Sequence, residues 1–150
     1  MLAVNGMSYR ARDSHNANSA IVVTVSPEDF GGSEPLDGLI FQQKLERCAY
    51  EEGKGKIPVQ RFEDYKMNKA SKNLGTILPE MKGQYLPANV RSIFPEKISA
   101  SIEEGILSFE RQIPGFSDPD SLLSGVESRT SSPIRIVRDE CYESNYSGIY

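Results

Sequence analysis

Residues 95–115 read PEKISASIEEGILSFERQIPG, the most regular stretch of the chain. Apolar residues recur there every three or four positions, at Ile98, Ile102, Ile106, Phe109 and Ile113. This spacing predicts an amphipathic helix that begins at Pro95 and is stopped by Pro114-Gly115. Its apolar stripe can pack in the chain's own core or against a second copy, and the sequence leaves both uses open.

A second helix is predicted between Pro35 and Gly53. Pro35 suits the first helical position, and the apolar residues that follow at helical spacing are Leu36, Leu39, Ile40, Leu45, Cys48 and Ala49. Residues 61–69 are long enough for another turn or two of helix.

Strands are predicted on both sides of these helices. Residues 19–26 (SAIVVTVS) are rich in β-branched side chains, and their nearly continuous apolar character indicates a strand buried on both faces and closed by Pro27. Residues 57–60 are short and extended, a strand starts at 125–129, and 134–137 alternates as a half-buried strand does. We therefore expect an α+β fold with a mixed β-sheet and several helices, in which the first and last strands come from opposite ends of the chain.

The composition is that of one folded domain spanning residues 1–150. The chain is 38% hydrophobic and 25% charged with a net charge of −4, which argues against a nucleic-acid partner. It contains no apolar run long enough to span a membrane and no secretory signal, so we expect a cytoplasmic protein without a membrane partner. Cys48 and Cys141 are too few for a disulfide framework, and no histidine or carboxylate cluster predicts a metal.

The first candidate site is the polar loop before the predicted strand 19–26. His15 is the only histidine, and histidine is the residue type that most often serves as an acid–base group at neutral pH, so it is a candidate for that role; Arg10 or Arg12 can hold an anion. The same loop carries the polar residues Asn16, Asn18 and Ser19. The loop is either one wall of a site or a solvated turn in which the asparagines bind local backbone.

The second candidate site is the segment GVESRTSSP at residues 125–133. Arg129 offers a planar fork to a carboxylate or carbonyl group, and hydroxyls follow it at Thr130, Ser131 and Ser132. Such hydroxyls also bind backbone in ordinary turns, so a structural turn is the alternative. Glu127 is expected to pair with a nearby arginine.

Other motifs do not support catalysis by this chain. Gly53-Lys54-Gly55 starts like a dinucleotide fingerprint, but Pro58 stands where the third glycine belongs and the segment follows a helix. A serine triad would need His15 as its base, and no serine lies in a nucleophile-elbow context.

Four separated segments together resemble a known family. They are residues 4–9 (VNGMSY), 17–23 (ANSAIVV), 58–61 (PVQR) and 125–136 (GVESRTSSPIRI). In this order they are similar to the largely uncharacterised FAD-dependent dehydrogenases whose C-terminal portion is called the FAD-dependent protein C domain. The resemblance covers essentially the whole chain.

The resemblance implies an inserted cap or substrate domain of a two-lobed flavoprotein. This chain lacks the dinucleotide-binding segments, and its closing residues 147–150 resemble the strand that leads relatives into a Gly-Glu-Gly stretch at the flavin. We therefore expect an excised domain whose full-length parent binds FAD, while the fragment binds none and is inactive. Its partners would be the FAD-binding lobe and a small-molecule substrate that the sequence does not identify.

The resemblance also implies roles for the candidate residues. Arg129, Thr130, Ser131, Ser132, Asn16, Asn18 and Ser19 would face substrate or flavin, and His15 is a weak catalytic candidate. The alternative is a non-catalytic interaction or dimerisation module of a larger protein.

Overall fold

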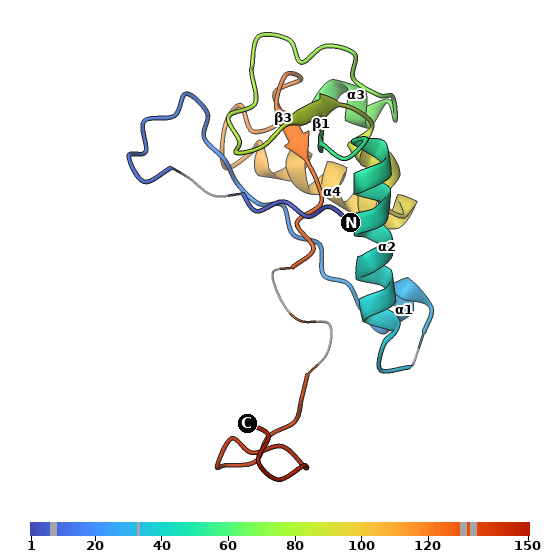
Figure 1. Ribbon diagram of the computed structural model, residues 1–150. Coiled ribbons are helices and arrows are strands. Elements are labelled where there is room, and N and C mark those ends of the chain that lie inside the picture. Colours follow the sequence, from blue (N-terminus) through green and yellow to red (C-terminus); the bar gives the residue numbers. More distant parts are fainter. Residues whose placement is uncertain (7–8, 33, 130–131, 133–134) are drawn as a thin grey trace.

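The computed structural model describes residues 1–6, 9–32, 34–129, 132 and 135–150. Its elements in chain order are α1 (Pro27–Phe30), α2 (Asp37–Glu52), β1 (Ile57–Arg61), α3 (Phe62–Lys66), β2 (Tyr85–Pro87), the 3₁₀ helix η1 (Val90–Ile93), α4 (Glu96–Phe109) and β3 (Leu122–Ser124) (Figure 1). A small mixed sheet and several helices make an α+β fold, as the sequence predicted.

The sheet is built around β1. Strand β1 pairs in parallel with β2 and antiparallel with β3, in the order β2-β1-β3. The three central residues of β1, Pro58, Val59 and Gln60, are buried. A central strand that is covered on both faces does not require alternating polar and apolar residues, and the sequence IPVQR of β1 shows no such alternation.

Helices α2 and α4 supply most of the core around the sheet. Helix α4 buries Ile98, Ile102 and Ile106, which are four residues apart and so share one face, while α2 buries Leu45 and Ala49. The part of the predicted apolar stripe formed by Ile98, Ile102 and Ile106 is therefore used by the chain's own core. No helix among the described residues is long and apolar enough to cross a membrane.

The fourth helix ends earlier than its apolar pattern indicates. It stops at Phe109, and Ile113 is 53% exposed. The Glu110 carboxylate accepts hydrogen bonds from the backbone N–H groups of Gly115 and Ser117, both at 2.8 Å. Because these bonds stabilise a turn, the chain leaves the helix before it reaches Pro114.

The strand predictions outside the middle of the chain are wrong. Residues 19–26 belong to no strand, helix or turn, and Pro27 begins α1. The last strand is 122–124, before the predicted start at 125, and residues 135–137 form no strand, while Ile134 lies outside the described residues. The sheet is thus not built from opposite ends of the chain. β-Branched composition favours extended backbone, but a strand also needs a neighbour to pair with.

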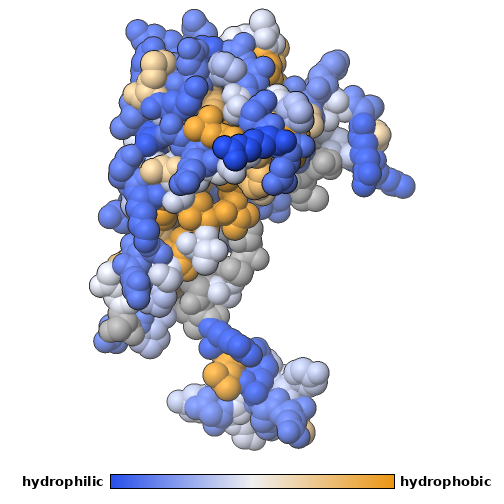
Figure 2. All heavy atoms as spheres, turned by 180° about the vertical axis from the view of Figure 1, so that it is seen from behind, coloured by the Kyte–Doolittle hydropathy of each residue, from blue (hydrophilic) through white to orange (hydrophobic). Residues whose placement is uncertain are grey.

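The C-terminal residues lie apart from this body. Figures 1 and 2 show the chain beyond residue 135 as a separate small unit. Asp139 organises a turn there by accepting hydrogen bonds from the N–H groups of Cys141 and Glu143. Cys141 is exposed, whereas Cys48 is half-buried and packs against the core.

Candidate functional site

Both candidate stretches of the sequence line one long groove. Its walls come from residues 2–6, 15–25, 121–128, α2 and α4, and it encloses about 2150 Å³. Small-molecule pockets usually measure about 300–1,000 Å³, so this groove is larger than a small ligand requires. Figure 2 shows hydrophobic side chains gathered in the middle of one face of the molecule, between hydrophilic margins.

The opening loop is fixed at the groove by residues far away in sequence. His15 Nδ1 lies 2.8 Å from Glu80 Oε1, and the Asn16 amide N–H donates to Glu80 Oε2 at 3.2 Å. The Asn16 side chain donates to the Leu78 carbonyl at 2.6 Å. The hydrogen bond with His15 lowers the pKa of Glu80. The His15 side chain is 92% exposed, so it lies at the rim and not in an enclosed pocket.

The second stretch is fixed by a buried acid on α2. Glu46 is 1% exposed, and its carboxylate accepts hydrogen bonds from Arg129 Nε at 2.8 Å, from Arg129 Nη2 at 2.7 Å and from Ser128 Oγ at 2.8 Å. The two bonds from Arg129 form the bidentate fork that guanidinium groups make with carboxylates. They are the main reason that the pKa of Glu46 is lowered, and the same pair raises the pKa of Arg129.

Further hydrogen bonds tie α2 to the N-terminal and C-terminal segments. Gln42 Nε2 donates to the Ser128 carbonyl at 2.7 Å, Leu2 N donates to the Glu46 carbonyl at 3.0 Å, and Val4 N donates to the Val126 carbonyl at 2.9 Å. Residues 2–4 and 126–128 are therefore held against each other and against α2.

The predicted site residues divide into two groups. The groove is lined by His15, Asn16, Asn18, Ser19 and Ser132, together with Arg10 from the same loop. Arg129 is bound to Glu46 and does not line the groove, although its side chain is 65% exposed. Thr130 and Ser131 lie outside the described residues. Glu127 is exposed, and the arginine pairs with Glu46.

The two acids that hold the site, Glu46 and Glu80, were not among the predicted residues. Glu46 carries a signal that was available: it lies between Leu45 and Ala49, on the buried side of an amphipathic helix. A carboxylate on such a face requires a partner, and that requirement points to an arginine. Glu80 has no comparable signal, because it lies in a loop whose position depends on the whole fold.

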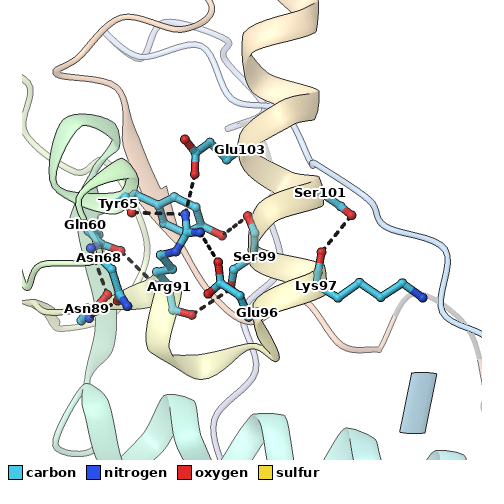
Figure 3. A network of polar contacts seen from close by, with 10 residues as sticks. All are labelled: Gln60, Tyr65, Asn68, Asn89, Arg91, Glu96, Lys97, Ser99, Ser101 and Glu103. Atoms are coloured by element: carbon cyan, nitrogen blue, oxygen red, sulfur yellow. Dashed lines mark hydrogen bonds and ion pairs between the residues drawn. The ribbon is translucent and has the colours of Figure 1, made fainter.

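A second, partly buried polar network is centred on Arg91 (Figure 3). Arg91 donates to Glu96 and Glu103, both at 2.6 Å, and its guanidinium lies 5.2 Å from the centre of the Tyr65 ring. The Tyr65 hydroxyl donates to the Ser99 carbonyl at 3.1 Å. These contacts join η1, α3 and α4.

Gln60 extends this network to the centre of the sheet. Its side-chain oxygen accepts from the backbone N–H of Arg91 at 3.0 Å, and its side-chain nitrogen donates to the Lys69 carbonyl and to Asn89 Oδ1. Among the described residues, every buried side-chain nitrogen and oxygen has a hydrogen-bond partner. We therefore assign this network to fold stability.

The chain is a small α+β domain with an open groove, and its sequence defines its family. Residues 1–130 match the family described as FAD-dependent protein, C-terminal domain-like, and the chain belongs to this family. An uncharacterized protein of Clostridium beijerinckii (strain ATCC 51743 / NCIMB 8052) is 43% identical over 152 residues, which cover 99% of this chain. The chain spans 28% of the length of that relative.

The described residues do not form a dinucleotide-binding site that could hold FAD without other segments. A dinucleotide-binding fold holds the pyrophosphate with closely spaced glycines between a strand and a helix N-terminus. The glycines Gly53 and Gly55 lie instead in the turn after α2, where the Gly55 N–H donates to the Tyr50 carbonyl and stabilises the end of that helix. No group of three or more His, Cys, Asp or Glu side chains lies together in the part of the chain that the structure describes.

Proposed function

We propose that the chain is the cap or substrate-side domain of an FAD-dependent oxidoreductase of the dehydrogenase type. In this proposal other segments of a full-length parent bind FAD, and the groove of this domain closes over the flavin and a small-molecule substrate. The family supports a flavoprotein, and the span of 28% of a relative leaves room for a separate flavin-binding lobe. The domain alone would have no turnover. A cytoplasmic location stays a prediction.

The observation that carries this proposal is the composition of the groove wall. Asn16, Asn18, Ser19 and Ser132 come from two distant segments and line the same groove, whose other wall includes the apolar residues Phe41 and Leu45. Cofactor and substrate sites typically combine apolar walls with a few polar groups that set orientation. When bound, the flavin would supply the redox chemistry, so no protein nucleophile is required.

Arg129 receives a positioning role in this proposal. Its guanidinium binds Glu46 through Nε and Nη2, which holds the 125–129 segment against α2. Ser132 follows three residues later at the groove. Direct contact of Arg129, Thr130 or Ser131 with flavin or substrate stays a prediction, as does an acid–base role for His15.

Flavin binding by the full-length parent and by the 150-residue chain tests this proposal. Both proteins are purified and their absorbance is measured at about 450 nm, where oxidised flavin absorbs. We expect a yellow parent and a colourless fragment. A colourless parent would contradict the flavoprotein function and favour the non-catalytic interaction module. A yellow fragment would show that residues of this chain are sufficient to hold the cofactor.

A further inference from the structure

Residues 20–25 (AIVVTV) belong to no helix, strand or turn and have no strand partner. Among the described residues, no backbone hydrogen bond joins this segment to any other part of the chain. Five of its six residues are β-branched, which is the composition of a strand. Backbone N–H and C=O groups in an apolar segment are normally paired in a completed structure.

From Ala20 to Thr24 the side chains alternate between exposed and half-buried, as they do in a strand with one covered face. Ile21 and Val23 pack against the hydrophobic core, while Thr24 is exposed and Val22 is 74% exposed. Alternation with period two is the geometry of a β-strand. The segment therefore already lies against the body of the domain with one face inward and one face uncovered.

Residues 20–25 themselves contain neither a charged residue nor a proline, two of the features that protect a free strand edge. Residues 14–27 contain no Asp, Glu, Lys or Arg. Natural edge strands that face water usually carry charges, bulges or prolines, which prevent other chains from pairing with them. An uncharged edge with an exposed valine indicates that another strand covers it in the complete protein.

We propose that residues 20–25 pair with a β-strand of the flavin-binding lobe of the same parent chain. This inference rests on the proposed function, which supplies that lobe. More than two thirds of the Clostridium beijerinckii relative lies outside the match, so a longer chain has ample sequence to provide the strand. A segment of the same chain also has a high effective concentration.

The size of the segment argues against a second copy as the occupant. Six residues of strand extend over about 20 Å, at about 3.3 Å per residue. A stable dimer usually buries about 800 Å² on each partner, which is more than one short strand supplies. Pairing within one parent chain does not need that area, because the covalent connection already holds the two parts together.

Residue-resolved hydrogen exchange of the full-length parent tests the pairing. We expect the amides of residues 20–25 to exchange on the order of 100-fold more slowly than in an unstructured peptide, because a paired amide exchanges only through local opening. If pairing occurs on one edge only, protection should alternate along the segment. The variant Val22→Lys should reduce this protection, whereas Val137→Lys, at a position 77% exposed and outside the groove, should not.

The outcomes separate this inference from the proposed function. A yellow parent whose residues 20–25 exchange at the unstructured rate overturns the strand pairing and leaves the cap function intact. A colourless parent with a protected segment overturns the flavin-binding lobe as the partner. Protection that disappears on dilution, together with a concentration-dependent mass by light scattering, would assign a second copy and overturn the proposal.

Discussion

Replacement of Glu46 by glutamine tests the contact that fixes the groove wall to α2. The carboxylate accepts three hydrogen bonds, two from Arg129 and one from Ser128. Glutamine keeps the shape of the side chain but offers one acceptor oxygen, and it places an amide NH₂ group beside existing donors. The substitution therefore removes charge-assisted bonds without creating a large cavity.

The expected loss of unfolding free energy for Glu46→Gln follows from these contacts. A hydrogen bond to a charged group contributes about 1.5–3 kcal/mol when it is buried, but an ion pair that water reaches contributes less than about 1 kcal/mol. Glu46 is buried, whereas the Arg129 side chain is 65% exposed, so the pair lies between these limits. We expect a loss of about 1–2 kcal/mol, or about 2–8 °C in Tm for a chain of this size.

Thermal unfolding of the 150-residue chain, followed by circular dichroism, measures this loss. Glu51→Gln is the matched control, because Glu51 is exposed on the same helix. Arg129→Ala should be more destabilising than Glu46→Gln, since it leaves a buried carboxylate without its cation. The reasoning is refuted if Glu46→Gln has the same Tm as Glu51→Gln, or if Arg129→Ala lowers the Tm less than Glu46→Gln does.

Three further outcomes follow from the core and from the acidic groups. Ile102→Ala should cost about 2–5 kcal/mol in urea unfolding, because it opens a cavity in the core, and a loss below 1 kcal/mol would contradict that packing. Tyr65→Phe should cost about 1 kcal/mol through the lost bond to Ser99, and an unchanged urea midpoint would contradict the bond. Because the pKa of Glu46 lies below its usual 4.5, its contribution to stability is complete above pH 4.5 and is lost as the pH falls through the lowered folded-state pKa. Glu46→Gln should flatten the stability profile in that acid range, and an unchanged slope would contradict this assignment.

The helices were predictable from the sequence because their signals are local. The four-residue spacing of Ile98, Ile102 and Ile106 identified α4, and Pro35 and Gly53 bracketed α2. The end of α4 was not predictable in the same way. The Glu110 carboxylate binds backbone N–H groups of the following turn, and this competes with continuation of the apolar pattern.

The strands were predicted less well because pairing depends on distant residues. Residues 57–60 are predicted to be extended and form β1, whereas β2 has only three residues, too few to show a periodic pattern in the sequence. The stronger apolar signal at 19–26 forms no strand in the described structure. β-Branched composition indicates a preference for extended backbone, but it does not indicate whether another strand is available for pairing.

The two polar stretches of the candidate site were predictable from the sequence, but their positions relative to each other and to α2 were not. Sequence position indicated the loop of His15 and the segment of Arg129, and the structure places both stretches at one groove. The ion pair between Arg129 and Glu46 depends on how α2 lies against residues 126–129, and no local sequence pattern specifies that packing. A buried acid on an amphipathic helix was the signal that could have revealed it.

The most direct test of the central claim asks whether flavin lies at the groove. Ser19→Cys places a thiol in the groove wall, and Ser101→Cys places one on the exposed side of α4 as a control. Alkylation of each site in the full-length parent is followed by mass spectrometry, with and without flavin. The account predicts that flavin slows alkylation at position 19 and leaves position 101 unchanged. Equal rates at position 19 with and without bound flavin would contradict a groove that closes over the cofactor.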